Sequence, residues 1–129
     1  MPAPATYTYS AQSLIDAQTA FLALVDGGSG AGRIRLFSEA DVQLAEITLT
    51  DPAGTIDGAG QLTITAAGPD TSADATGVCT WGTIIDSDTN VLLSLPAEAG
   101  TTPVSGKLVI SNTSILIATE VSLVSATIG

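Results

Sequence analysis

The sequence predicts an all-β domain with one helix near its N-terminus. Stretches of alternating apolar and polar residues recur from Gly32 onward, and turn signals separate them roughly every 8–12 residues. One earlier stretch has helical periodicity instead. We expect about eight strands in a jelly-roll-like β-sandwich or barrel. The 129 residues suit a single domain, which we place at residues 10–129.

Residues 1–9 precede this domain, and we expect them to form an extended N-terminal arm. Pro2 and Pro4 oppose helix formation and favour extended backbone. Tyr7 and Tyr9 alternate with threonines and are two of the five aromatic residues of the chain. We therefore expect these prolines and tyrosines to contact a partner surface, with a locally docked or frayed tail as the alternative.

The helix is predicted over residues 10–26. Ser10 is a suitable N-cap, and Gly27 and Gly28 supply a left-handed stop. Apolar residues recur at spacings of three and four, which predicts a face packed against a sheet. This stripe comprises Leu14, Ala17, Phe21 and Val25, widened by Ile15 and Leu22.

The remaining chain is predicted to form strands and turns. The expected strands are 33–37, 45–49, 62–65, 76–85, 91–95, 107–111, 114–118 and 120–128. Turns are predicted at 51–54 and 57–60, where Asp, Pro and Gly cluster. Pro96 is expected to end the strand before it, so that 97–105 forms a loop.

Charge and composition argue against several functions. The formal net charge of −10 opposes binding to nucleic acid and to anionic membranes. The chain has no histidine, which removes the usual general base and the commonest metal ligand. No apolar stretch has the roughly 20 residues of a membrane helix, and no secretory signal is recognisable. We therefore expect a protein that is not an enzyme and holds no cofactor or metal.

One acidic motif resembles the start of a calcium-binding loop. Asp86, Asp88 and Asn90 have the required spacing. However, Val91 stands where the loop needs glycine, and Ala97 where it needs a bidentate glutamate. The motif is better interpreted as a hairpin tip whose side chains bind local backbone amides.

Four further residues have both a structural and a functional interpretation. Cys79 is the only cysteine, and in a strand it is expected to be a buried small hydrophobe, with a reactive thiol as the alternative. Trp81 is expected to anchor the core, with an exposed binding aromatic as the alternative. Asp70 and Asp74 suit a capped turn better than the carboxylate pair of a glycosidase.

The order of these segments is similar to that of a group of small tailed-phage and prophage structural proteins. The resemblance covers roughly residues 12–128, and its most specific part is the stretch Ala-Asp-Ala-Thr-Gly-x-x-Thr-Trp at 73–81. Such proteins typically have arginine or an aromatic residue after the tryptophan, where this chain has Gly82. They also have glycine in the next turn, which Asp88-Thr89-Asn90 replaces, and the N-terminal arm is particular to this chain.

The resemblance implies a virion component, and we expect a capsid decoration or cement protein. It would be synthesised in the bacterial host cytoplasm and lie on the capsid exterior, as a homotrimer bound to the major capsid protein. The arm, through Pro2, Pro4, Tyr7 and Tyr9, and the sheet edges would make the contacts. Two alternatives remain open: a phage tail or neck component, and a carbohydrate-binding module for host adsorption.

Overall fold

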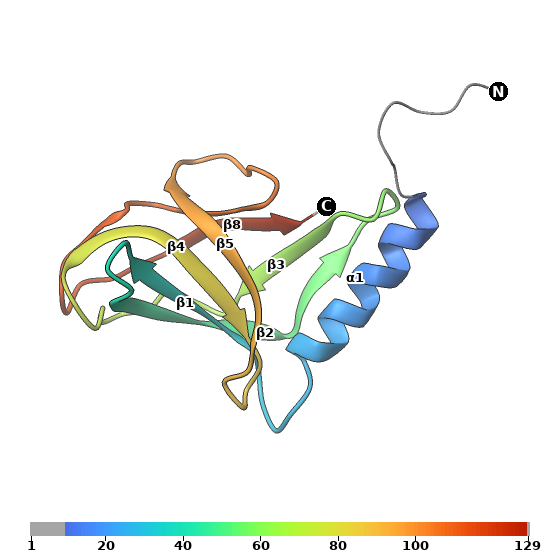
Figure 1. The fold of residues 1–129 in the computed structure, drawn as a ribbon, viewed down its shortest axis with the longest axis horizontal. Coiled ribbons are helices and arrows are strands. Elements are labelled where there is room, and N and C mark those ends of the chain that lie inside the picture. The colour runs from blue at the N-terminus through green and yellow to red at the C-terminus, as the bar shows by residue number, and fades with distance from the viewer. Residues whose placement is uncertain (1–9, 129) are drawn as a thin grey trace.

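The computed structural model describes residues 10–128, in which one helix precedes eight strands (Figure 1). The elements are α1 Ala11–Val25, β1 Arg33–Ser38, β2 Gln43–Ile56, β3 Leu62–Ala66, β4 Gly77–Ile85, β5 Val91–Ala99, β6 Lys107–Ile110, β7 Ser114–Ile115 and β8 Leu123–Ile128. The predicted class, mostly β with an N-terminal helix, is confirmed.

Seven of the strands close into a barrel. Their order is β1-β2-β3-β8-β6-β5-β4, and β4 pairs back to β1. The short strand β7 pairs only with the start of β4. All these pairings are antiparallel except that between β5 and β6. Of the two predicted architectures, the barrel is the one observed, and closure leaves few free sheet edges.

Strand alternation determines which residues fill the barrel. On β1, Ile34 and Leu36 are fully buried, whereas Arg33 and Arg35 face outward. Burying the inward aliphatic side chains supplies most of the driving force for folding. The largest fully buried side chains in this core are those of Val25, Ile34, Leu36, Leu44, Ile47, Leu49, Leu62, Ile84, Leu108 and Ile110.

Helix α1 lies beside β2 on one side of the barrel (Figure 1). Ser10 caps it as predicted, because its hydroxyl accepts a hydrogen bond of 3.1 Å from the Ser13 N–H. The predicted stripe is wrong at one position: Ala17 is exposed, and Gln18 is buried in its place. The Gln18 amide donates to the Ile128 carbonyl at 3.1 Å, so this buried polar group is satisfied and connects the helix to β8.

The predicted turn at 51–54 is wrong. These residues form an irregular bulge within the long strand β2, where the pairing with β3 shifts between Leu49 and Gly54. The bulge buries Ala53 completely, and the Ala53 N–H donates to the Asp26 carboxylate at 2.8 Å. A contact with the end of α1 therefore stabilises a conformation that local residue preferences assign to a turn.

The predicted end of β5 at Pro96 is also wrong. The strand continues to Ala99, but its partner changes: Pro96 pairs with Trp81 of β4, and Ala97 pairs with Leu108 of β6. A proline lacks only one ladder hydrogen bond, and a strand that is changing partners tolerates that loss. Near the C-terminus, the strands predicted over 114–118 and 120–128 are shorter than expected.

No helix within residues 10–128 is long and apolar enough to cross a bilayer.

Candidate functional site

The outer wall formed by β1 and β4 carries an aromatic pair beside two arginines. We call Arg33, Arg35, Phe37 and Trp81 the aromatic–arginine face. Phe37 and Trp81 are cross-strand partners, and their rings stack with centroids 4.6 Å apart and planes 19° apart. Trp81 is therefore only partly buried and faces away from the barrel interior, so the prediction that it anchors the core is wrong.

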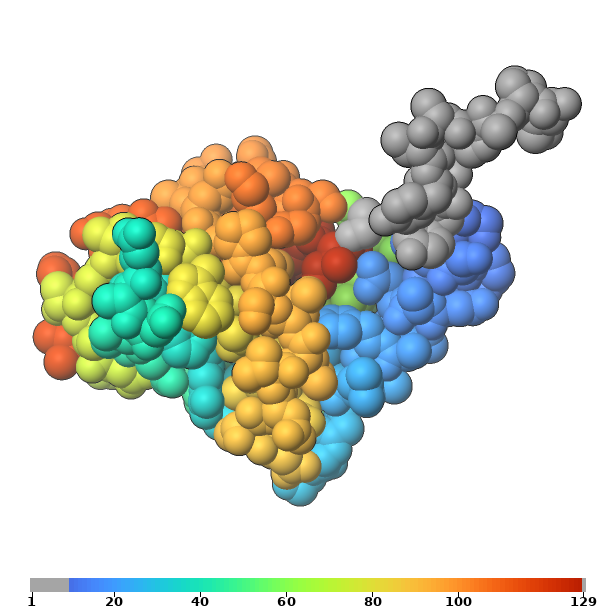
Figure 2. All heavy atoms as spheres, viewed as in Figure 1, coloured from blue at the N-terminus to red at the C-terminus, as the bar shows by residue number. Residues whose placement is uncertain are grey.

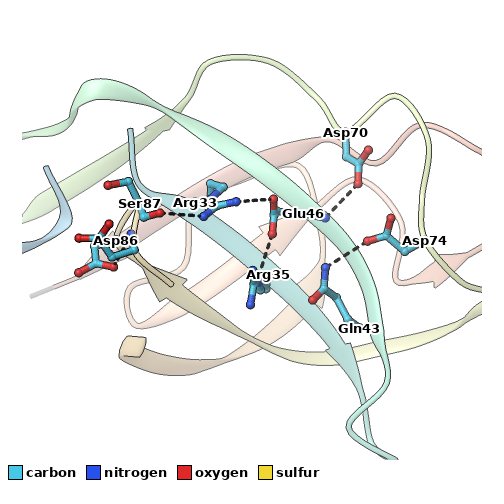
Figure 3. Close-up of polar contacts among 9 residues, drawn as sticks. Arg33, Arg35, Gln43, Glu46, Asp70, Asp74, Asp86 and Ser87 are labelled. Carbon is cyan, nitrogen blue, oxygen red and sulfur yellow. Dashed lines mark hydrogen bonds and ion pairs between the residues drawn. The ribbon is translucent and has the colours of Figure 1, made fainter. Parts of the chain in front are cut away.

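A single glutamate holds both arginines of this face (Figure 3). The Glu46 carboxylate lies 3.1 Å from Nη1 of Arg33 and 2.8 Å from Nε of Arg35. Arg33 also donates to the Ser87 carbonyl at 3.2 Å. Because these side chains are only about one-quarter exposed, the three charges form a fixed triad with a net charge of +1.

The neighbouring carboxylates stabilise backbone and side-chain geometry, as Figure 3 also shows. Asp70 accepts the Glu46 N–H at 2.9 Å. It also accepts the N–H of Ser72, which the figure does not label, at 3.0 Å. Asp74 accepts the Gln43 amide at 3.1 Å. This arrangement agrees with the capped turn predicted for this segment.

The tip of the β4–β5 hairpin has the local hydrogen bonds expected of a turn. Asp86 accepts the N–H groups of Asp88 and Asn90 at 3.0 and 2.9 Å, and the Asn90 side-chain amide at 3.0 Å. These bonds, the Asn90 side chain first, hold the pKa of Asp86 below its usual value. Residues 10–128 contain no cluster of three or more His, Cys, Asp or Glu side chains suited to a metal.

Cys79 is buried, with a relative exposure of 2 %, as predicted. Burial raises the pKa of its thiol, so the thiolate form that reacts with electrophiles is disfavoured. Between β5 and β6, Lys107 pairs with Glu98 at 3.5 Å, and both side chains remain substantially exposed.

A groove of about 440 Å³ crosses the outer wall over β3 and β8. One side is the β5–β6 connection at 100–106, which we call the flap. The flap is fastened by hydrogen bonds from Gly106 N to the Thr127 carbonyl at 2.7 Å and from Gly100 N to the Ile110 carbonyl at 3.1 Å. In Figure 1 it arches beside β8, and Figure 2 shows its orange atoms next to the red atoms of β8. The groove is lined by Gln61, Thr63, Ile64, Thr65, Ala66, Pro103, Leu123, Val124, Ser125 and Thr127.

The lining of this groove is neutral, and hydroxyl groups dominate its polar part. Among residues 10–128, none of the side chains that line it is ionisable or aromatic, although the chain has three basic and thirteen acidic residues. Thr63 and Thr65 are exposed on β3. The hydroxyls of Ser125 and Thr127 are buried without a hydrogen-bond partner among the described residues. These two hydroxyls could therefore still form hydrogen bonds with a ligand in the groove.

The residues singled out from the sequence fall into two groups. Pro2, Pro4, Tyr7 and Tyr9 lie outside the described residues. The contacts described for the others are structural. Trp81 lies on the β1–β4 wall, Asp86 at the β4–β5 hairpin, and Asp70 and Asp74 beside β2. The groove was not predicted, although alternating hydroxyl-bearing residues, Thr63 and Thr65 of β3 and Ser125 and Thr127 of β8, indicate a hydroxyl-rich outer surface.

No protein-family model, curated protein or solved structure matches the chain.

Proposed function

We propose that this chain is a structural protein of a bacteriophage virion, a capsid decoration protein that binds the outer surface of the major capsid protein. The observation that carries the proposal is the aromatic–arginine face on a closed barrel. Tryptophan and arginine are enriched in protein interfaces and dominate their binding energy. A closed barrel presents such a face rigidly, so little conformational entropy is lost on binding.

The chemistry of the described residues is compatible with assembly. The carboxylates around the face cap backbone amides or hold arginines, and these contacts occupy groups that catalysis would need. The net charge of −10 favours a position away from the packaged genome. Because barrel closure leaves few edges for strand addition, the face and the N-terminal residues Pro2, Pro4, Tyr7 and Tyr9 are the proposed shell contacts.

A carbohydrate-binding module is the second candidate, since aromatic side chains also bind sugars. The geometry favours a protein partner over a glycan. Phe37 and Trp81 stack on each other, so they do not form the open side-by-side platform on which a sugar ring lies. The Trp81 indole N–H is also engaged, because it donates to the Ser38 carbonyl at 3.1 Å.

The proposal is tested by binding the protein to empty shells assembled from the major capsid protein of the same phage. We expect co-sedimentation with shells, and Trp81→Ala should weaken it about tenfold or more, as loss of an interface anchor does. Val78→Ala is the matched control, because Val78 is on the same strand, is 59 % exposed and lies outside the face. Circular dichroism verifies that both variants remain folded.

A second variant, which lacks residues 1–9, tests the proposed role of the N-terminal residues. This deletion is expected to abolish shell binding while leaving the barrel folded. Sedimentation velocity on the free protein tests the proposed trimer. Immunogold label confined to the tail or neck of intact virions would contradict the decoration role. A change in Trp81 fluorescence with host surface glycans, without shell binding, would favour the carbohydrate-binding module.

A further inference from the structure

We propose that the groove over β3 and β8 is a docking site for the N-terminal segment of its own chain, residues 1–9, bound in extended form. This inference concerns the free protein and does not rest on the proposed function. The flap forms one side of this groove and covers part of a barrel surface that would otherwise be open. Val109 shows the effect, because it is not part of the core cluster and is nevertheless fully buried. Gly100, the first residue of the flap, lies against it: a Cβ at Gly100 would be 3.2 Å from Val109 Cγ1.

The lining determines the class of ligand. Because no ionisable side chain of the described part of the chain lines the groove, a charged ligand would lose its hydration there without gaining an ion pair. A sugar would find no aromatic ring to stack on. A neutral peptide fits better, because its backbone donors and acceptors can pair with hydroxyls such as those of Thr63 and Thr65, and small apolar side chains suit Pro103 and Val124.

Residues 1–9 have the matching composition. The sequence Met-Pro-Ala-Pro-Ala-Thr-Tyr-Thr-Tyr contains no charged side chain, and all sixteen charged residues, three basic and thirteen acidic, follow Ser10. Pro2 and Pro4 restrict the backbone to extended conformations, which lowers the entropic cost of binding in a groove. The side chains of the segment and those that line the groove are thus uncharged, within a strongly acidic protein.

The path from the helix to the groove is short. Ser10 directly precedes α1, and the first turns of α1 pack against the β2–β3 turn at Gly60, where a side chain would collide with Leu14. The next residue, Gln61, lines the groove. Nine extended residues span up to about 30 Å, whereas the five residues of β3 span about 17 Å. The segment is therefore long enough to follow the whole groove, and its covalent attachment makes docking intramolecular.

Paramagnetic relaxation in the full-length protein tests the docking. A nitroxide is attached to Ala3→Cys, while Cys79, which is buried, stays unlabelled under native conditions. We expect the amide signals of Thr63, Thr65 and Val124 to lose more than half of their intensity relative to the diamagnetic state. Thr65→Glu, which places a charge in the neutral groove, should restore most of that intensity. Thr80→Glu is the matched control, because Thr80 is an exposed threonine on β4 outside the groove, and it should leave the broadening unchanged.

A mixture of spin-labelled unenriched protein with unlabelled ¹⁵N-enriched protein identifies the chain that supplies the segment. Broadening in the singly labelled protein, independent of concentration and absent from the mixture, supports the proposal. Broadening only in the mixture would overturn it in favour of a neighbouring copy's groove. Uniform signals, or broadening confined to the aromatic–arginine face, would also overturn it. None of these readouts involves a capsid shell, so failure here is distinguishable from failure of the proposed function.

Discussion

At the residue scale, several aspartates of this protein accept hydrogen bonds from backbone N–H groups. Asp26 holds the bulge of β2, Asp70 holds the N–H of Glu46, and Asp86 closes the β4–β5 hairpin. Such charge-assisted hydrogen bonds give these three carboxylates a structural role in an acidic chain.

The pKa of Asp86 provides a test at this scale. Asn90→Ala removes the side-chain hydrogen bond that is the main cause of the lowered pKa, so we expect the pKa to rise toward its usual value. Since the folded-state pKa lies below that of the unfolded chain, Asp86 stabilises the fold above its usual pKa. That contribution is lost as the pH falls through the folded-state value. Carboxyl NMR titration measures the shift, and Asn112→Ala, at a turn elsewhere, should leave it unchanged.

At the element scale, two strands depart from the boundaries that turn residues suggest. Strand β2 passes through Pro52 and Gly54, and β5 passes through Pro96, because each gains contacts that outweigh a missing ladder bond. A further glycine has a packing role: a Cβ at Gly82 would lie 2.5 Å from Leu108 Cδ1 and 2.8 Å from the Arg35 carbonyl. This explains why the residue after Trp81 is a glycine in this chain.

Gly54→Ala tests the close approach of β2 and β3. A Cβ at position 54 would collide with the backbone carbonyl of Thr63, which cannot move without disturbing the pairing. We expect a loss of about 1–3 kcal/mol in the free energy of unfolding, measured by denaturant titration. Gly58→Ala is the control, since nothing lies within 4 Å of its Cβ. Equal stability of the two variants would contradict the packing described here.

At the scale of the whole molecule, a neutral groove and a cationic triad are set in a protein of net charge −10. Seven strands enclose a core of aliphatic side chains, and the closed ladder satisfies backbone groups that an open sheet would expose. The surface charge contributes mutual repulsion, which opposes the compact state. Stability should therefore depend on ionic strength.

This dependence is testable by thermal unfolding in sodium chloride. At pH 7, raising the concentration from about 0.01 M to about 0.15 M shortens the screening length from roughly 30 Å to 8 Å, and the unfolding temperature should rise by a few degrees. At a pH near the isoelectric point of about 4.1, the same change should have little effect. A salt effect of equal size at both pH values would show that ion-specific effects, not charge repulsion, are responsible.

The sequence by itself determined the elements whose signals are local. Helical periodicity with the Ser10 cap predicted α1, and alternation predicted the cores of the strands, because both patterns follow from backbone geometry. Tertiary structure decided the rest. The bulge at Ala53, the continuation through Pro96 and the burial of Gln18 depend on partners distant in the chain. The groove likewise joins β3, the flap and β8, and only closure of the barrel brings these segments together.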